Sequence, residues 1–349
     1  MAKLPVAILG CTGAVGQKFV ALLADHPWFE VRQLSASTER IGLRYGDTVR
    51  WREPTPIPPR VADLVLSATA PAVGIRIAFS ALDAPVAREV EPAFAAAGVM
   101  VVSNASAFRM AADVPLLIPE VNPGHLSLLD SQRKGRGWSG GIVANPNCST
   151  AALVTALAPI HRSHGIETAV AATLQAASGA GYPGVPSLDL IDNVIPFIGG
   201  EEEKIESECR KLLGDAEADG VTDATLTVSS MVHRVPVLDG HMVSVSLKLR
   251  TPASPEQVIE SLESFRGDET VAALPSSPAR PVEVDRRDDR PQPRLDRDRG
   301  SGMAVTVGRV RPCPVNTVRF TVLGHNLIRG AAGAAVQNAE LIVSSGRIS

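Results

Sequence analysis

The N-terminal segment constrains the fold most, because it joins an apolar run to a helical pattern through a glycine-rich turn. Residues 4–9 are apolar, the heptapeptide GCTGAVG follows at 10–16, and a helical pattern continues from Phe19. The apolar run is typical of a buried parallel strand. Glycines allow a tight turn and let backbone approach a pyrophosphate at the helix N-terminus. The spacing is GxxGxxG rather than GxGxxG, so a tight turn without a ligand is the alternative.

Alternation of strand and helix continues through the first 150 residues. Strands are predicted at 29–34, 61–68 and 99–104, a helix at 91–97, and a polar surface segment at 130–141. Repeated alternation predicts a doubly wound parallel sheet, in which ligands bind at the carboxyl ends of the strands. The fold class is therefore α/β, with a dinucleotide site at this edge.

The segment after the second strand bears on the choice of cofactor. Ser35 and Ser37 come first, and Glu39, Arg40 and Arg44 follow. An acidic residue at the end of this strand binds the ribose hydroxyls of NAD, whereas small hydroxyls with a nearby cation suit a 2′-phosphate. The pattern favours NADP(H), although Glu39 could repel that phosphate.

Charge and cysteine content exclude several classes of function. The net charge is −3, which gives no electrostatic reason to expect nucleic acid or an anionic membrane as partner. The four cysteines, at 11, 148, 209 and 313, show no CxxC spacing, so neither a metal site nor a disulfide scaffold is expected. No leader-like or membrane-spanning run is found, and the expected location is cytoplasmic.

Cys148 is the candidate nucleophile. It lies between Asn145-Pro146-Asn147 and an alanine-rich run predicted to be helical. Ser149 or Thr150 is the predicted cap. The positive end of the helix would lower the thiol pKa and favour the thiolate. The alternative is a small apolar side chain that fills a loop.

After Cys148 the pattern changes to half-buried strands, at 168–175, 228–232 and 241–249, with a helix that includes 201–205. Such alternation predicts a mixed or antiparallel sheet and hence a second domain. The stretch 276–300 is rich in Pro, Arg and Asp, which by composition alone predicts a disordered linker. A last helix is predicted near 329–344.

Three motifs together resemble the aspartate-semialdehyde dehydrogenases, in the branch typical of archaea and fungi. They lie at 145–150, 175–181 and 233–241, with further matches at 182–186, 192–196, 199–204, 289–296 and 325–333. The resemblance implies a Rossmann-like domain at 1–147, completed by a C-terminal helix at about 325–349, and an α+β catalytic and dimerisation domain at 148–324. It also implies that 289–296 is a family segment and not a linker.

The activity implied is the NADPH-dependent reductive dephosphorylation of 4-phospho-L-aspartate to L-aspartate 4-semialdehyde, in the biosynthesis of lysine, threonine and methionine. Cys148 would form a thioacyl intermediate, His241 would be the general acid/base, and Gln175 would orient the intermediate. The resemblance also implies a homodimer or homotetramer.

The resemblance assigns the binding residues as well. Arg234 would bind the α-carboxylate and Glu201 the α-amino group, while Arg109 and Lys204 would hold the phosphate. The cofactor contacts implied are Thr12, Gly13, Ala14, Val15, Ser37, Ser178, Gly179 and Asn326. Relatives often have an arginine where this chain has Glu39, which bears on NADP but not on the fold.

Three alternatives keep the fold and change the function. Malonyl-CoA and succinyl-CoA reductases share the cysteine thioester chemistry, but a malonyl group has no amine for Glu201 to bind. N-acetyl-glutamyl-phosphate reductases match less well. A non-catalytic nucleotide sensor would not need the set of Cys148, Gln175, Arg234 and His241.

Overall fold

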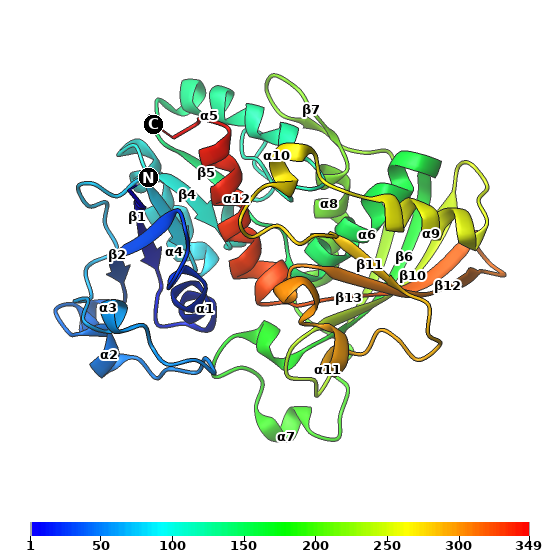
Figure 1. The fold of residues 1–349 in the computed structure, drawn as a ribbon, viewed down its shortest axis with the longest axis horizontal. Helices are drawn as coiled ribbons and strands as arrows, with labels where there is room; N and C mark the ends of the chain where they lie inside the picture. Colours follow the sequence, from blue (N-terminus) through cyan, green and yellow to red (C-terminus); the bar gives the residue numbers. More distant parts are fainter. Residues whose placement is uncertain (1, 349) are drawn as a thin grey trace.

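Two sheets lie side by side in the computed structural model, which describes residues 2–348 (Figure 1). The first sheet is parallel, with strand order β2-β1-β3-β4-β5. Its strands are β1 (Leu4–Leu9), β2 (Phe29–Ser35), β3 (Ile77–Ser80), β4 (Met100–Ser103) and β5 (Gly141–Ala144). Its helices are α1 (Ala14–Leu23), α2 (Tyr45–Thr48), α3 (Pro59–Ala62), α4 (Ala84–Ala96) and α5 (Leu128–Arg136). The predicted doubly wound parallel sheet is confirmed.

The glycine-rich turn enters α1 as predicted, and its last glycine has a steric reason. A Cβ on Gly16 would lie 2.3 Å from the carbonyl oxygen of Gly10, far inside any real contact. Glycine is therefore required for α1 to pack this closely against the turn after β1. The motif therefore has a role in close helix–strand packing.

The predicted strand at 61–68 is wrong, and the third strand is β3. Two prolines, Pro58 and Pro59, start the short helix α3, since proline suits the first turn of a helix. The residues after α3 make only isolated bridges, from Ser67 to Ser35 and from Val65 to Arg44. The prediction at 130–141 also missed a helix: α5 buries Leu128, Leu129 and Gln132 beneath its polar face.

The second sheet is mixed, with strand order β11-β12-β13-β10-β6-β9. Its strands are β6 (Ile166–Gln175), β9 (Thr227–Arg234), β10 (His241–Leu249), β11 (Val282–Asp285), β12 (Val305–Pro312) and β13 (Val318–Gly324), and β7 (Asp215–Ala216) and β8 (Val221–Thr222) form a separate ribbon. The helices of this half are α6 (Cys148–His164), α7 (Ser187–Leu190), α8 (Glu201–Leu212), α9 (Pro255–Ser264), α10 (Glu269–Ala272) and α11 (Pro293–Asp296). The predicted mixed sheet is confirmed.

The linker predicted from composition at 276–300 is wrong, because its charges are used in ordered contacts. Arg290 and Arg299 both pair with the buried carboxylate of Asp296. Arg299 also donates to Asp285 at 2.6 Å, at the end of β11. Opposite charges that neutralise one another across a short segment allow it to fold against the sheet.

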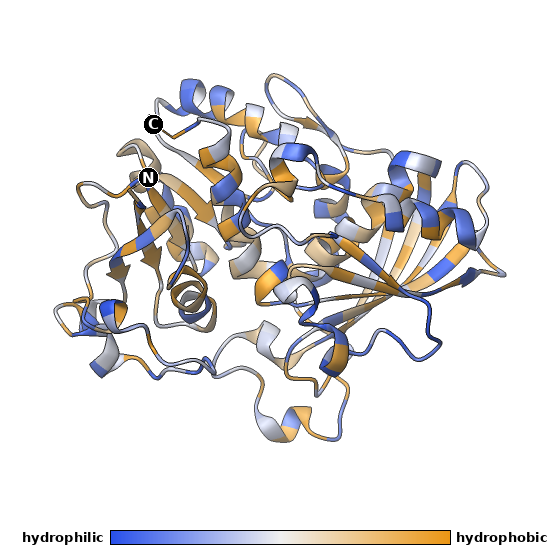
Figure 2. Cartoon of the chain, in the orientation of Figure 1, coloured by the Kyte–Doolittle hydropathy of each residue, from blue (hydrophilic) through white to orange (hydrophobic). Residues whose placement is uncertain are grey.

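The apolar core joins the two halves. One cluster of buried side chains extends from Leu9 and Val101 in the first sheet, through Leu153 in α6, to Val243 and Val322 in the second. The C-terminal helix α12 (Gly333–Ser344) then returns to the first sheet and packs near β4 (Figure 1). Hydrophobic residues colour most of the first sheet, and outer helices such as α5 carry hydrophilic ones (Figure 2). Within residues 2–348, no helix is both long and apolar enough to cross a membrane.

Candidate active site

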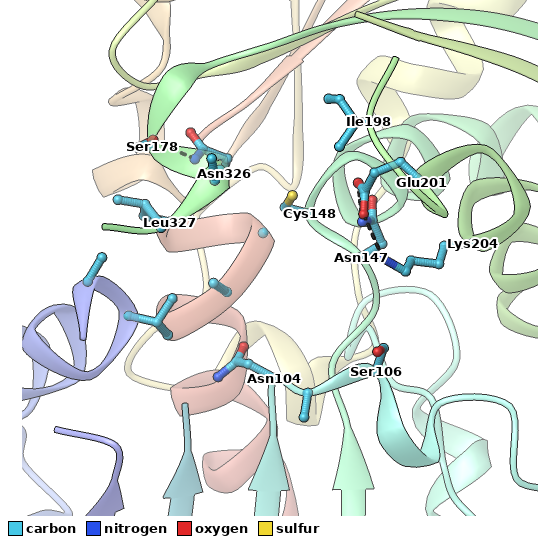
Figure 3. A pocket seen from close by; sticks show the side chains of 18 of the residues that line it. Asn104, Ser106, Asn147, Cys148, Ser178, Ile198, Glu201, Lys204, Asn326 and Leu327 are labelled. Atoms are coloured by element: carbon cyan, nitrogen blue, oxygen red, sulfur yellow. Dashed lines mark hydrogen bonds and ion pairs between the residues drawn. The ribbon is translucent and has the colours of Figure 1, made fainter. Parts of the chain in front are cut away.

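A cleft of about 650 Å³ opens between the two sheets, with Cys148 at the first position of α6 (Figure 3). Most of the predicted site residues line it, namely Ala14, Val15, Arg109, Cys148, Ser178, Gly179, Glu201, Lys204, Arg234 and Asn326. Thr12 and Gly13 lie in the turn before α1, and Ser37 lies in the exposed segment after β2. Gln175 and His241 are fully buried and do not line the cleft.

Asn147 is the residue that caps α6, the helix that begins at Cys148. Its side-chain oxygen accepts hydrogen bonds from the backbone N–H groups of Ser149 at 2.9 Å and Thr150 at 3.2 Å. The predicted caps, Ser149 and Thr150, are wrong because the helix starts earlier, at Cys148. The first-turn position puts the sulfur beside the positive end of α6.

Burial opposes that helix end at the thiol. Desolvation, reinforced by the negative charge of Glu201, raises the pKa of Cys148 to about 12, although Arg109 and Arg234 act in the opposite direction. The expected thiolate near neutral pH is therefore not favoured by these surroundings. A neutral thiol that must lose its proton on reaction is the state that the geometry supports.

A buried carboxylate connects the N-terminal half of the chain to the start of α6. Glu208 of α8 accepts from Arg109 Nη1 at 3.0 Å with one oxygen and from the Asn147 backbone N–H at 2.5 Å with the other. Arg109 also donates to the carbonyl of Asn104 at 2.7 Å. The guanidinium is therefore fixed before any anion binds, and its orientation is coupled to the start of α6.

One face of α8 supplies the other charged groups. Glu201, Lys204 and Glu208 recur at intervals of three and four residues, which places them on the same side of the helix. Glu201 accepts from Lys204 Nζ at 2.9 Å and from Asn147 Nδ2 at 2.7 Å. In Figure 3, Asn147, Glu201 and Lys204 lie on one side of Cys148, and the hydrogen-bonded pair of Ser178 and Asn326 lies on the other.

Sheet register brings three more predicted residues together. Gln175 ends β6 and is paired with Arg234, the last residue of β9, while His241 begins the adjacent antiparallel strand β10. Arg234 donates to the Ala176 carbonyl at 2.7 Å. The Nε2 atoms of Gln175 and His241 are both buried and have no partner within residues 2–348. These unsatisfied groups mark the end of the sheet as a functional region.

His241 has a defined neutral form. Its Nδ1 accepts from the Ala176 backbone N–H at 3.0 Å, so the proton of the neutral imidazole is on Nε2. Burial, with the positive charge of Arg234, lowers the pKa of His241 to about 3. Gly179 covers this ring, since a Cβ there would lie 2.8 Å from Arg234 Nη1 and 3.0 Å from His241 Nε2. Glycine thus allows the cleft wall to lie directly on both side chains.

The cofactor side fits a dinucleotide. Gly13 is the N-cap of α1 and provides no side-chain cap, and the first turn carries no acidic residue. The N–H groups of Ala14 and Val15, which line the cleft, are thus available to a pyrophosphate. In the segment after β2, Ser37 donates to Glu39, which lowers the pKa of that carboxyl group. Glu39 therefore competes for a predicted cofactor contact.

Sequence reasoning missed the roles of three residues here. Asn147 lies within the 145–150 motif, but its side chain was not predicted to cap the helix. Asn104 stands out only as the end of a predicted strand, and Glu208 does not stand out at all. The available signal was the i, i+7 spacing of Glu208 from Glu201 on one helix face. A buried carboxylate is expected where a cation also faces the core.

Two family models match the chain, and both describe one class of protein. Residues 5–129 match the semialdehyde dehydrogenase NAD binding domain, and residues 157–329 match the semialdehyde dehydrogenase dimerisation domain. The fold and site are thus those of a semialdehyde dehydrogenase. The predicted domain boundaries, at 147/148 and about 324/325, stay a prediction.

Comparison with individual relatives shows which family of semialdehyde dehydrogenases the chain resembles. The chain is 50% identical over 339 residues to the aspartate-semialdehyde dehydrogenase of Archaeoglobus fulgidus, with 97% of each chain covered. It is 43% identical over 359 residues to that of Cryptococcus neoformans, covering 99% and 98%. The crystal structure of the Candida albicans enzyme with NADP matches with a TM-score of 0.92 at 39% identity, covering 99% of each chain. The chain belongs to the aspartate-semialdehyde dehydrogenase family and groups with its archaeal and fungal members.

Proposed function

We propose that this enzyme reduces 4-phospho-L-aspartate to L-aspartate 4-semialdehyde and phosphate with NADPH, and catalyses the reverse, as a step toward lysine, threonine and methionine. The observation that carries the proposal is the cleft itself. A single thiol at a helix start faces two cation–carboxylate pairs, Arg109–Glu208 and Lys204–Glu201, with Arg234 beside them. An acyl phosphate with an amino group and a carboxylate needs that set of charges.

The thiol is the proposed nucleophile. Cys148 gives its proton to Nε2 of His241 in the tautomer that carries its proton on Nδ1, attacks the acyl carbon and displaces phosphate, which leaves a thioester. Bound NADPH would supply the hydride that reduces this thioester. The resulting thiohemiacetal oxyanion loses the thiolate as the C–S bond breaks, and the aldehyde is released. Because the thiol pKa is raised, proton removal is part of the first step.

His241 and Gln175 are the proposed partners of the tetrahedral stages. With its proton on Nε2, His241 presents a hydrogen-bond donor suited to an oxyanion. The general acid/base role implied by the family requires Nε2 to become an acceptor, and the Ala176 hydrogen bond must then break. The unpartnered Gln175 Nε2 offers a second donor.

The paired charges suggest how substrate is recognised. Arg109, already oriented by Glu208, would bind the phosphate together with Lys204. Lys204 would leave Glu201 on binding, which frees that carboxylate for the α-amino group. Arg234 would bind the α-carboxylate. In this proposal each internal ion pair is exchanged for a contact with substrate.

NADP(H) is the proposed cofactor. The uncapped start of α1 would hold the pyrophosphate, with Ser178, Gly179 and Asn326 as further contacts. Arg40 would pair with a 2′-phosphate after Glu39 turns away. The Candida albicans enzyme, whose crystal structure contains NADP, supports this choice.

The assembly proposed is a homodimer or a homotetramer. Val170, Leu174 and Met231 project from the six-stranded sheet and are 45%, 39% and 62% exposed. These apolar side chains lie on the face that α6 does not cover, which we call the open face. A match to a dimerisation domain supports burial of this face against a second copy.

The test is oxidation of L-aspartate 4-semialdehyde with NADP⁺ and NAD⁺ in parallel, with and without phosphate. Phosphate-dependent formation of reduced nicotinamide is the expected result. Activity with malonyl-CoA and NADPH, but none with the semialdehyde, would replace the proposal by the acyl-CoA reductase alternative.

A further inference from the structure

The π-helical turn Ile328–Ala332, which we call the π-turn, lies directly against Cys148. A Cβ on Gly330 would lie 2.6 Å from the Cβ of Cys148 and 2.9 Å from its Cα, so glycine is required for this approach. In Figure 3 the ribbon that continues from Leu327 passes beside Cys148. The π-turn is thus the wall against which the side chain of Cys148 rests.

Two backbone hydrogen bonds of the π-turn span five residues. The N–H of Gly330 donates to the His325 carbonyl, and the N–H of Ala332 donates to the Leu327 carbonyl, each at 3.0 Å. Turns of this kind are rare and are frequently found at functional sites. Leu327 and Gly330 both line the cleft. The position of the π-turn therefore affects the cleft wall as well as the thiol of Cys148.

Arg329 fixes the π-turn through a buried ion pair. Its side chain and that of Glu120, in the N-terminal half, are each 1% exposed. The pair is bidentate, with Nη1 to Oε1 at 3.0 Å and Nη2 to Oε2 at 2.8 Å. Gln337 of α12 accepts from Arg329 at 3.1 Å and donates to Glu120 at 2.9 Å. Burial opposes the ionised form of Glu120, but the charge of Arg329 outweighs burial and lowers the pKa of that carboxyl group.

Arg329 also contacts the helix that begins at Cys148. Its Nη2 donates to Thr155 Oγ1 at 3.1 Å. Thr155 lies seven residues after Cys148, two turns along α6, so both residues are on the same face of that helix. Adjacent residues of the π-turn therefore contact this face at two heights, Gly330 at Cys148 and Arg329 at Thr155.

A second connection comes from the segment just before α6. Asn145 Nδ2 donates to the carbonyl of Ala331 at 2.9 Å and to Asn104 Oδ1 at 2.8 Å. The π-turn is thus held at Arg329 and at Ala331, on either side of the glycine that touches Cys148.

We propose that Arg329 is a positioning residue: paired with Glu120, it holds the π-turn against Cys148 so that the thiol faces the cleft. The inference rests on the proposed role of Cys148 as nucleophile and adds a residue that does not itself line the cleft. An apolar side chain could fill the same space without the desolvation cost of a buried charge. A guanidinium bonded to three separate parts of the chain instead specifies one orientation of the turn.

The test uses Arg329→Lys, which keeps the charge and loses the bidentate fork. We expect kcat to fall about tenfold or more, because a small displacement of a reacting atom is costly. KM for phosphate should stay within about twofold, since its proposed ligands, Arg109 and Lys204, lie outside the π-turn.

Alkylation of Cys148 by iodoacetamide should move in the opposite direction to kcat. A looser π-turn admits water and reduces the desolvation that raises the thiol pKa. A fall of one unit in that pKa would increase the rate at pH 8 about tenfold. The Cys313→Ser background is used, because Cys148 is then the one cysteine within residues 2–348 that is not fully buried.

Glu340→Gln is the matched control for a lost buried carboxylate pair. Glu340 of α12 is fully buried and lies 2.7 Å from His26 Nε2. Its loss should lower the melting temperature but leave kcat and the alkylation rate unchanged, with assays run well below the melting temperature of each variant. The proposal is overturned if Glu340→Gln changes both rates as Arg329→Lys does, or if Arg329→Lys lowers only the melting temperature.

Gly330→Ala tests the contact with Cys148 directly and keeps the ion pair, so it decides the matter even where Arg329→Lys does not fold. The added methyl group must displace either Cys148 or the π-turn, and kcat should fall about tenfold or more. A wild-type kcat in this variant also overturns the proposal. Alkylation needs no turnover, so it reports the position of the thiol separately from the nucleophile assignment, which Cys148→Ser tests.

Discussion

The cleft and the open face treat positive charge in opposite ways. In the cleft, Arg109 and Lys204 each have a carboxylate within 3.0 Å, Glu208 and Glu201. On the open face, Arg311 and Arg319 face each other across the strand pair. Internal carboxylates fix the orientation of cations and reduce their net field, whereas an unpaired cluster depends on solvent or a bound anion. The difference separates a preorganised site from a surface whose cations are balanced by solvent or by a second copy.

The largest effect is expected from a substitution that inactivates the cleft and leaves the open face unchanged. Cys148→Ser should lower kcat by roughly a thousandfold or more, because an alcohol is a far weaker nucleophile than a thiol in the same place. NADPH affinity should stay unchanged. Steady-state kinetics and equilibrium dialysis measure both. Residual turnover above about a tenth of wild type would contradict the nucleophile assignment.

Removing the carboxylate partner should make the cleft resemble the open face. In Glu208→Gln, Arg109 loses its counterion and the Asn147 N–H loses a charged acceptor. We expect KM for phosphate in the oxidative direction to rise about tenfold or more, with KM for the aldehyde nearly unchanged. The folded protein should also be less stable, because a buried guanidinium is left unpaired.

Glu206→Gln is the matched control for that variant. Glu206 lies two residues earlier on α8 and accepts from the Ser230 backbone N–H at 3.0 Å. It should lose some stability but keep its KM for phosphate. Equal changes in both KM values in Glu208→Gln would show that the carboxylate supports the fold alone.

Proton loss from Cys148 tests the comparison between the cleft and the open face. Cations that are already paired with carboxylates contribute little electrostatic stabilisation to a thiolate. With the thiol pKa raised to about 12, the rate of alkylation by iodoacetamide should rise about tenfold per pH unit from pH 7 to 9. The Cys313→Ser background removes a partly exposed thiol whose pKa is lowered by a Ser246 hydrogen bond. A rate already constant at pH 7 would mean that α6, Arg109 and Arg234 outweigh burial.

Sequence patterns predicted what is local or continuous in the chain. The glycine turn, strands at 29–34, 99–104 and 241–249, and the position of Cys148 at a helix start could all be predicted, since each depends on adjacent residues. The family resemblance supplied the candidate residues from both halves. Strand 61–68 could not be rejected, because an apolar run bounded by turns does not reveal its partner strands.

Contacts between residues far apart in the chain could not be predicted from the sequence. The acceptor that connects Arg109 to Asn147 comes from α8, 99 residues away from Arg109, and no periodicity records that pairing. The raised thiol pKa likewise depends on how deeply the whole fold buries Cys148. The position at a helix start alone predicts a lowered thiol pKa, and the desolvation of the thiol outweighs that effect.

The smallest expected effect concerns the carboxylate of Glu39, whose surroundings are intermediate between those of the cleft and those of the open face. Glu39 is exposed, is followed by Arg40 and accepts from Ser37, so it partly neutralises the region proposed for the 2′-phosphate. Glu39→Gln should raise the preference for NADP⁺ over NAD⁺ about threefold, because an exposed charge is screened by solvent. The ratio of kcat/KM for the two cofactors measures it, with Glu30→Gln on β2 as a control outside this segment. A preference that falls in Glu39→Gln would instead place Glu39 on the ribose hydroxyls, as in an NAD-binding enzyme.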